Sequence, residues 1–149
     1  MFKKKKFEDK LGDLFRSIIE LGFEYVDNSR EINVIYVYCS NEIETYYVDF
    51  LYDINGSIYD ISEVPLDIDK SFDMQGNLGE MASKELILIK DLFKKEKREV
   101  PTEIKLTYKP KTNFFDSKIS YDLKWSNTED LMNTDLFDKW RESLTNYNS

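Results

Sequence analysis

The sequence predicts an α+β fold: one domain over residues 1–149, in which an antiparallel sheet carries helices packed on one side. Two observations favour this class. Helical and alternating apolar patterns follow one another in the order α-β-β-β-α-β-β-α, and the expected strands come in groups separated by short turns. Because hairpin spacing leaves no room for the crossover helices of a parallel sheet, we expect an antiparallel one.

The first expected helix covers about residues 7–21. Its apolar residues recur at helical spacing, and Gly22 follows at the position of a C-terminal cap. The residues of this apolar face are Phe7, Leu11, Leu14, Phe15, Ile18 and Leu21.

Three strands are expected next. Residues 32–39 are apolar on both faces, which predicts a central strand. After a turn at 40–42, the second strand covers 44–53, and its odd-numbered residues form the more polar face. Asn55-Gly56 is a strong hairpin signal because both residues tolerate positive φ, and the third strand follows at 58–61.

Residues 62–77 have no clear periodicity and predict a loop. A second helix is expected over 78–93, with Asn77 and Glu80 spaced as in a capping box. The remaining expected elements are strands at 103–108 and 115–123 and a helix at about 134–144.

Composition excludes several classes of protein. The chain has no histidine, which excludes histidine-based catalytic triads and histidine-ligated zinc. Cys39 is the only cysteine, so no intrachain disulfide forms and a reducing, cytoplasmic location is expected. The run Lys3–Lys6 is not followed by an apolar segment, and no window is long enough to span a membrane. We expect no catalytic residues, cofactor or metal.

Negative charge is concentrated in one part of the chain. Nine acidic residues and one lysine lie between Glu42 and Asp73, a local charge of −8 that equals the net charge of the whole chain. Two interpretations explain this concentration of negative charge. It is either an ordinary solvated face of the protein or a docking surface for a basic partner. It argues against direct nucleic-acid binding. The candidate partner-binding residues are Tyr47, Asp49, Asp53, Tyr59, Asp60, Glu63, Asp67 and Asp69.

Two short motifs resemble metal sites. Glu103-Ile104-Lys105 matches half of a metal-dependent nuclease site, but alternating charges on the exposed face of a strand also explain it. Asp67, Asp69 and Asp73 resemble part of a calcium loop, although the glycine and the closing glutamate are not at the required positions.

The C-terminal two fifths of the chain resemble the YezG-like immunity family. The matching segments are the helix IKDLFKKEK, the phrase VPTEIKLTYKPKT, the strand SKISYDL and the ending LFDKWRESL, which contains the F-x-x-W signature. The N-terminal part matches only in layout, a helix followed by tyrosine-rich strands, and it departs from the family in lacking the tryptophan that often opens the first strand. The resemblance implies an immunity protein, or antitoxin, that binds and neutralises a bacterial toxin domain.

An acidic surface is compatible with such a role, because a nuclease toxin presents a cationic cleft that grouped carboxylates can cover. We therefore expect stoichiometric occlusion of a toxin, with no chemistry. There are two alternatives. The protein is either a metal-dependent nuclease that uses Glu103 and Lys105, or a cytosolic adaptor for another basic partner. The sequence leaves the oligomeric state open.

Overall fold

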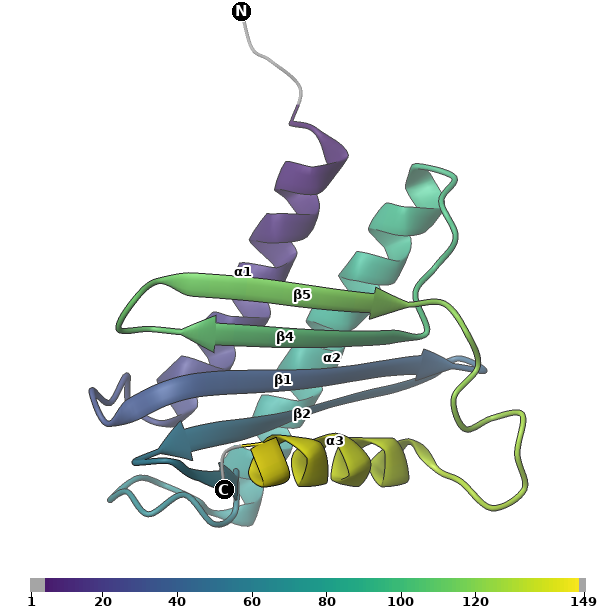
Figure 1. Cartoon of the computed structure of the whole chain (residues 1–149). Helices are drawn as coiled ribbons and strands as arrows, with labels where there is room; N and C mark the ends of the chain where they lie inside the picture. The colour runs from purple at the N-terminus through teal and green to yellow at the C-terminus, as the bar shows by residue number, and fades with distance from the viewer. Residues whose placement is uncertain (1–4, 148–149) are drawn as a thin grey trace, which may run out of the picture.

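The computed structural model describes residues 5–147, which form three helices and five strands in the predicted order (Figure 1). Lys3 and Lys4 of the N-terminal lysine run lie outside the described residues. Within them, no helix is long and apolar enough to cross a membrane. The elements are α1 (Phe7–Tyr25), β1 (Ile32–Glu42), β2 (Thr45–Ile54), β3 (Ser57–Asp60), α2 (Phe72–Lys95), β4 (Glu103–Lys109), β5 (Phe114–Ser120) and α3 (Asn133–Tyr147).

The five strands form one antiparallel sheet in the order β3-β2-β1-β4-β5, which confirms the α+β class. β1 is central, as its two apolar faces predicted. The turn between β2 and β3 is the predicted Asn55-Gly56, with φ values of 54° and 85°. This left-handed pair matches the twist of the flanking strands, so the hairpin is specified locally.

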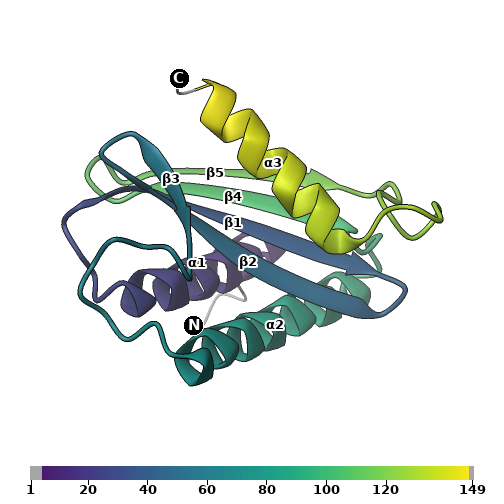
Figure 2. The same cartoon turned by 90° about the horizontal axis from the view of Figure 1, so that it is seen from below.

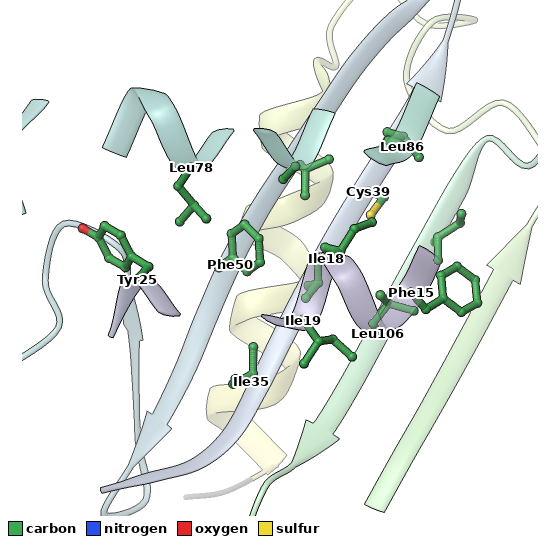
Figure 3. Close-up of a cluster of buried hydrophobic side chains, with 14 of the residues drawn as sticks. Phe15, Ile18, Ile19, Tyr25, Ile35, Cys39, Phe50, Leu78, Leu86 and Leu106 are labelled. Atoms are coloured by element: carbon green, nitrogen blue, oxygen red, sulfur yellow. The ribbon is translucent and has the colours of Figure 1, made fainter. Parts of the chain in front are cut away.

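The main core lies between the sheet and the pair α1 and α2 (Figure 3). Alternate residues of β1 and β2 face the two helices, among them Ile35 and Phe50. Gly22 lies inside α1 and does not cap it, because the helix continues to Tyr25. A Cβ at Gly22 would lie 2.7 Å from the Phe50 ring, so this glycine permits close approach of α1 to the sheet.

The third helix differs from the expected arrangement, because α3 lies on the opposite face of the sheet from α1 and α2 (Figure 2). There it closes a smaller core, in which Phe137 contacts residues of β1 and β2. The physical reason is the pattern already noted in β1: a strand that is apolar on both faces needs a cover on both. The sheet residues of this second core are Val34, Tyr36, Tyr38 and Leu51.

Three element boundaries also differ from the prediction. β1 continues through the expected turn to Glu42, and the turn is Ile43-Glu44, with φ values of 45° and 55°. α2 begins at Phe72, because the Ser71 hydroxyl accepts the backbone N–H of Met74 at 3.2 Å and caps the helix. β5 ends at Ser120 instead of continuing to residue 123.

Candidate functional site

The segment between β3 and α2, residues 61–71, is called the acidic loop below. It is held from within. The carboxylate of Asp60 accepts the backbone N–H groups of Ser62 and Glu63 at 2.9 and 3.1 Å. At the other end, Lys70 Nζ donates to the carbonyl oxygens of Val64 and Leu66 at 2.6 and 3.3 Å. Lys70 thus holds the loop backbone, and it forms no ion pair with a carboxylate of the described residues.

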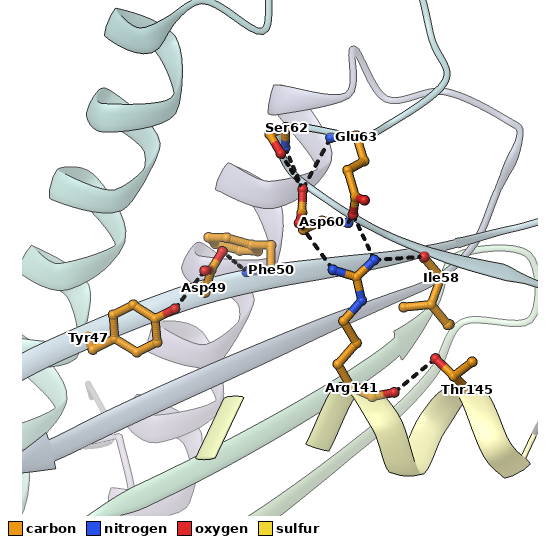
Figure 4. A network of polar contacts seen from close by, with 9 residues as sticks. All are labelled: Tyr47, Asp49, Phe50, Ile58, Asp60, Ser62, Glu63, Arg141 and Thr145. Carbon is orange, nitrogen blue, oxygen red and sulfur yellow. Dashed lines mark hydrogen bonds and ion pairs between the residues drawn. The ribbon is translucent and has the colours of Figure 1, made fainter. Parts of the chain in front are cut away.

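Arg141 of α3 binds the start of the loop (Figure 4). Its guanidinium lies 3.1 Å from Asp60 and 2.7 Å from Glu63, and it also donates to the Ile58 carbonyl. Burial raises the pKa of Asp60, but the bonds from Ser62 and Glu63 and the charge of Arg141 outweigh it, and the pKa lies below its usual value. Two predicted partner-binding carboxylates are therefore engaged in holding α3.

Tyr47 and Asp49 lie on the sheet face covered by α3 and form a pair of their own (Figure 4). The Tyr47 hydroxyl donates to Asp49 at 2.7 Å, and the Phe50 backbone N–H donates to the same carboxylate at 2.8 Å. Burial raises the pKa of Asp49 despite these bonds, and the charges of Asp60 and Asp138 add to the effect. The face expected to be open to a partner is thus partly closed by α3.

Asp53 and Tyr59 also serve the fold. Asp53 is buried and accepts the N–H of Gly56 at 3.0 Å and the side-chain amide of Asn33 at 3.3 Å, which supports the β2–β3 turn. Tyr59 packs against the main core. The structure therefore does not bring the eight predicted residues together on one free surface.

The carboxylates that remain free lie at the end of the acidic loop and the start of α2. Asp67, Asp69 and Asp73 are exposed, and within the described residues none is within ion-pair distance of a cation. Asp69 accepts the backbone N–H of Ser71 at 2.9 Å, which lowers its pKa and keeps it ionised. These three residues lie close together in the sequence and form an acidic cluster at the end of the acidic loop and in the first turn of α2.

Phe72 lies within this cluster and was missed by the sequence analysis. It is 91% exposed, the largest exposure among the large apolar side chains described. It belongs to the first turn of α2 and follows the cap residue Ser71 directly. An aromatic residue between Asp69 and Asp73 was the available signal, but the segment had been interpreted as a loop without periodicity. We call Asp67, Asp69, Phe72 and Asp73 the acidic patch.

The Glu103–Lys105 motif has a structural role. Glu103 is buried and accepts the Tyr38 hydroxyl at 2.7 Å, while Lys105 Nζ lies 3.8 Å from it and 5.6 Å from the centre of the Trp140 ring. The part of the chain that the structure describes contains no group of three acidic, cysteine or histidine side chains placed to hold a metal ion. The pair thus links the sheet to α3.

Cys39 and Glu42 on β1 are also enclosed. Burial raises the pKa of the Cys39 thiol to about 12, so it is not a reactive nucleophile. Glu42 accepts the backbone N–H groups of residues 124–126 at 2.9 to 3.4 Å and the Ser126 hydroxyl at 2.6 Å. Burial raises the pKa of Glu42, but these bonds outweigh it and lower the pKa below its usual value. Glu42 thereby anchors the connection that leads to α3.

In comparison with known proteins, no family model matches the chain, and no curated protein is significantly similar to it. The resemblance to the YezG-like family therefore stays a prediction from the quoted segments.

Proposed function

We propose that the protein is an immunity protein that binds a basic toxin domain, such as a secreted nuclease, and neutralises it by stoichiometric occlusion in the cytoplasm of the cell it protects. The observation that supports this most is Phe72, an aromatic side chain 91% exposed between Asp69 and Asp73. Aromatic residues, phenylalanine among them, are enriched in protein interfaces, and surrounding carboxylates steer a basic partner toward them.

The acidic patch has the properties that binding without catalysis requires. Ser71 caps α2 and Lys70 holds the loop backbone, so the patch sits on an ordered support. A preformed surface loses little conformational entropy on binding. Among residues 5–147 no cation forms an ion pair with its carboxylates, so their charge is available to a partner. Compared with the sequence-based prediction, the proposed surface keeps Asp67 and Asp69, adds Phe72 and Asp73, and no longer depends on Asp49 or Asp53.

Affinity purification tests this proposal. The tagged chain is recovered from its native cells at low salt, and bound proteins are identified by mass spectrometry. We expect one basic toxin domain that is released as salt rises, because charge steering and surface pairing are screened. Purified toxin is then titrated with the chain, and loss of toxin activity should be complete near one equivalent.

Three variants test whether the acidic patch is the surface that binds the toxin. Phe72→Ala should weaken toxin binding by about 30-fold or more, the effect of losing a hot-spot side chain. The double reversal Asp69→Lys/Asp73→Lys should slow association. The matched control, Glu129→Lys/Asp130→Lys, makes the same charge change at two exposed residues outside the patch. Equal toxin binding by all three variants and the unaltered chain would refute the patch, and the absence of a toxin among bound proteins would refute the function.

A further inference from the structure

β5 is an outer strand whose far edge is open. It pairs with β4 on one side, and the described sheet has no strand beyond it. The other outer strand, β3, has only four residues, whereas β5 has seven and contains no proline. Long, regular edge strands present unpaired N–H and C=O groups that accept a further strand.

The space beside this edge is not empty on the helix side. α1 and α2 lie behind the sheet and run on past β5 (Figure 1). Phe115 and Ile119 of β5 face these helices: the Phe115 ring lies 6.1 Å from Phe15, and Ile119 packs against the main core. Phe115 is nevertheless 43% exposed. A further strand would therefore lie over the protruding helices and cover an apolar side chain.

A hollow of about 400 Å³ adjoins Phe115. It lies between α1 and the β4–β5 hairpin and combines aromatic walls with a few polar groups, the composition that suits a buried side chain of a ligand. Strand addition commonly uses backbone bonds for affinity and such pockets for specificity. The lining residues are Gly12, Arg16, Ile19, Glu20, Phe23, Tyr108, Asn113 and Phe115.

The opposite face of β5 carries two free charges. Asp116 and Lys118 are exposed, and within the described residues neither forms an ion pair. In the sheet register Lys118 lies opposite Lys105, and Asp116 lies opposite Thr107. Like charges directly opposite one another are unfavourable, so a carboxylate on the open side of Lys118 would be stabilising.

We propose that the β5 edge binds an extended segment of another protein as a sixth, antiparallel strand. The register assigns the partner's side chains: an acidic residue opposite Lys118, a basic residue opposite Asp116, and apolar residues opposite Ile119 and Phe115. Read from its N-terminus, the segment is apolar, acidic, any residue, basic, apolar. The apolar residue opposite Phe115 borders the hollow.

The occupant is a single extended segment and not a second copy of this chain. A two-fold pairing of β5 strands would place the helices of both copies on the same face, where α1 and α2 already extend past the edge (Figure 1). The site is also separate from the acidic patch, because β5 and β3 are at opposite edges of the sheet. The inference therefore goes beyond the proposed function and does not depend on it.

A peptide copied from β5 itself can serve as the probe. Residues 115–119 follow the pattern required of the partner: apolar, acidic, any residue, basic, apolar. A labelled peptide with the sequence of residues 113–121, NFFDSKISY, is titrated with the full-length protein by fluorescence anisotropy. The control peptide, NFFKSDISY, exchanges the two charged residues and keeps composition and net charge. We expect the first peptide to bind about tenfold more tightly, because the exchange turns two attractive cross-strand pairs into repulsive ones.

The reciprocal variant, Asp116→Lys/Lys118→Asp, should reverse this preference, which a merely structural role of these residues would not do. Gly12→Leu should weaken binding of the first peptide by reducing the hollow, since a side chain at Gly12 meets no other atom within 4 Å at its Cβ. Equal binding of the two peptides, or no binding by either, would overturn the proposal. A dimer of the free chain that Lys118→Asp dissociates would also overturn it, by assigning the edge to a second copy.

Discussion

The two faces of the sheet are built by different means. In the part of the chain that the structure describes, the face under α1 and α2 is closed by a continuous apolar core with 23 buried residues, among them Phe50 and Ile18. The face under α3 has only five such residues within the same range. There, polar contacts hold the helix and its preceding connection: Arg141 binds Asp60 and Glu63, and Glu42 binds residues 124–126. The first face supplies most of the stability, and the second positions a helix.

The difference shows why the second face resembled a binding surface. A polar network beneath a helix and a polar surface prepared for a partner use the same residues, carboxylates beside tyrosines. The pair Tyr47–Asp49 belongs to the former. What separates the two cases is whether the carboxylates bind side chains beneath a helix, as Asp49 and Asp60 do, or stay exposed with backbone donors at most, as Asp69 does. Six variants test how sharply the two faces differ.

The largest expected effect comes from deleting one phenylalanine on each face. Phe50→Ala should lower the free energy of unfolding by roughly 3–5 kcal/mol, because Phe50 is only 1% exposed and a cavity would open beneath α1. Phe137→Ala removes the same atoms but should cost less, since the smaller core can collapse or release α3 alone. Urea denaturation measures both. If Phe137→Ala costs as much as Phe50→Ala and lowers amide protection in α1, the two faces form one cooperative unit.

The next effect concerns the anchor of the α3 connection. Glu42→Gln should cost roughly 1.5–3 kcal/mol, because an amide nitrogen replaces one of two oxygens that accept N–H groups. The folded-state pKa of Glu42 lies below the unfolded value. Its stabilisation is therefore present above the unfolded pKa and lost as pH falls through the folded pKa. Denaturation at neutral and acidic pH should show the difference between Glu42→Gln and the unaltered chain shrinking in acid; a constant difference would contradict this.

Two glycines of α1 allow a comparison on the sheet face that α1 and α2 cover. Gly22→Ala should destabilise by about 1–3 kcal/mol, because the new Cβ meets the Phe50 ring at 2.7 Å. Gly12→Ala should stabilise by about 0.5–1 kcal/mol, since its Cβ meets nothing within 4 Å and alanine favours the helix. Thermal unfolding of both variants gives the comparison. A shift of the same sign in both would mean that helix propensity, and not packing against the sheet, controls this face.

The smallest effect is expected at Asp49. Burial raises its folded pKa above the unfolded value, so its stability contribution is retained below the unfolded pKa and lost as pH rises through the folded pKa. Asp49→Asn should therefore match or exceed the unaltered chain at neutral pH, by up to about 1 kcal/mol, and lose any advantage in acid. NMR titration of the carboxyl group measures the pKa directly. A value at or below the usual range would contradict the account.

The sequence predicted features that are set locally. The Asn55-Gly56 turn depends on two adjacent residues, and the central position of β1 follows from its own apolar pattern. The predicted start of α2 was wrong. Asn77 and Glu80 are spaced as in a capping box, but the residue that caps the helix is Ser71. Glu42 was assigned to a turn because its hydrogen-bond donors lie more than 80 residues away in the chain.

In the candidate site, too, the sequence predicted what is set locally and missed what depends on distant contacts. Local composition located the negative charge, and it included Asp67 and Asp69, which the structure leaves free. It could not show that Asp60 and Glu63 bind Arg141, because that contact depends on the placement of α3. Phe72 was overlooked because an exposed aromatic residue has no periodic partner in the sequence.

The two tryptophans of the chain both lie on the α3 side. Trp125 donates its indole N–H to Ser40 at 3.0 Å, and the Trp140 ring packs against Tyr36 and Tyr38. Intrinsic fluorescence therefore reports on the docking of α3 and its connection, whereas far-ultraviolet circular dichroism is dominated by the longer α1 and α2. The protein thus contains two independent optical signals, one for each face of its sheet, without any label.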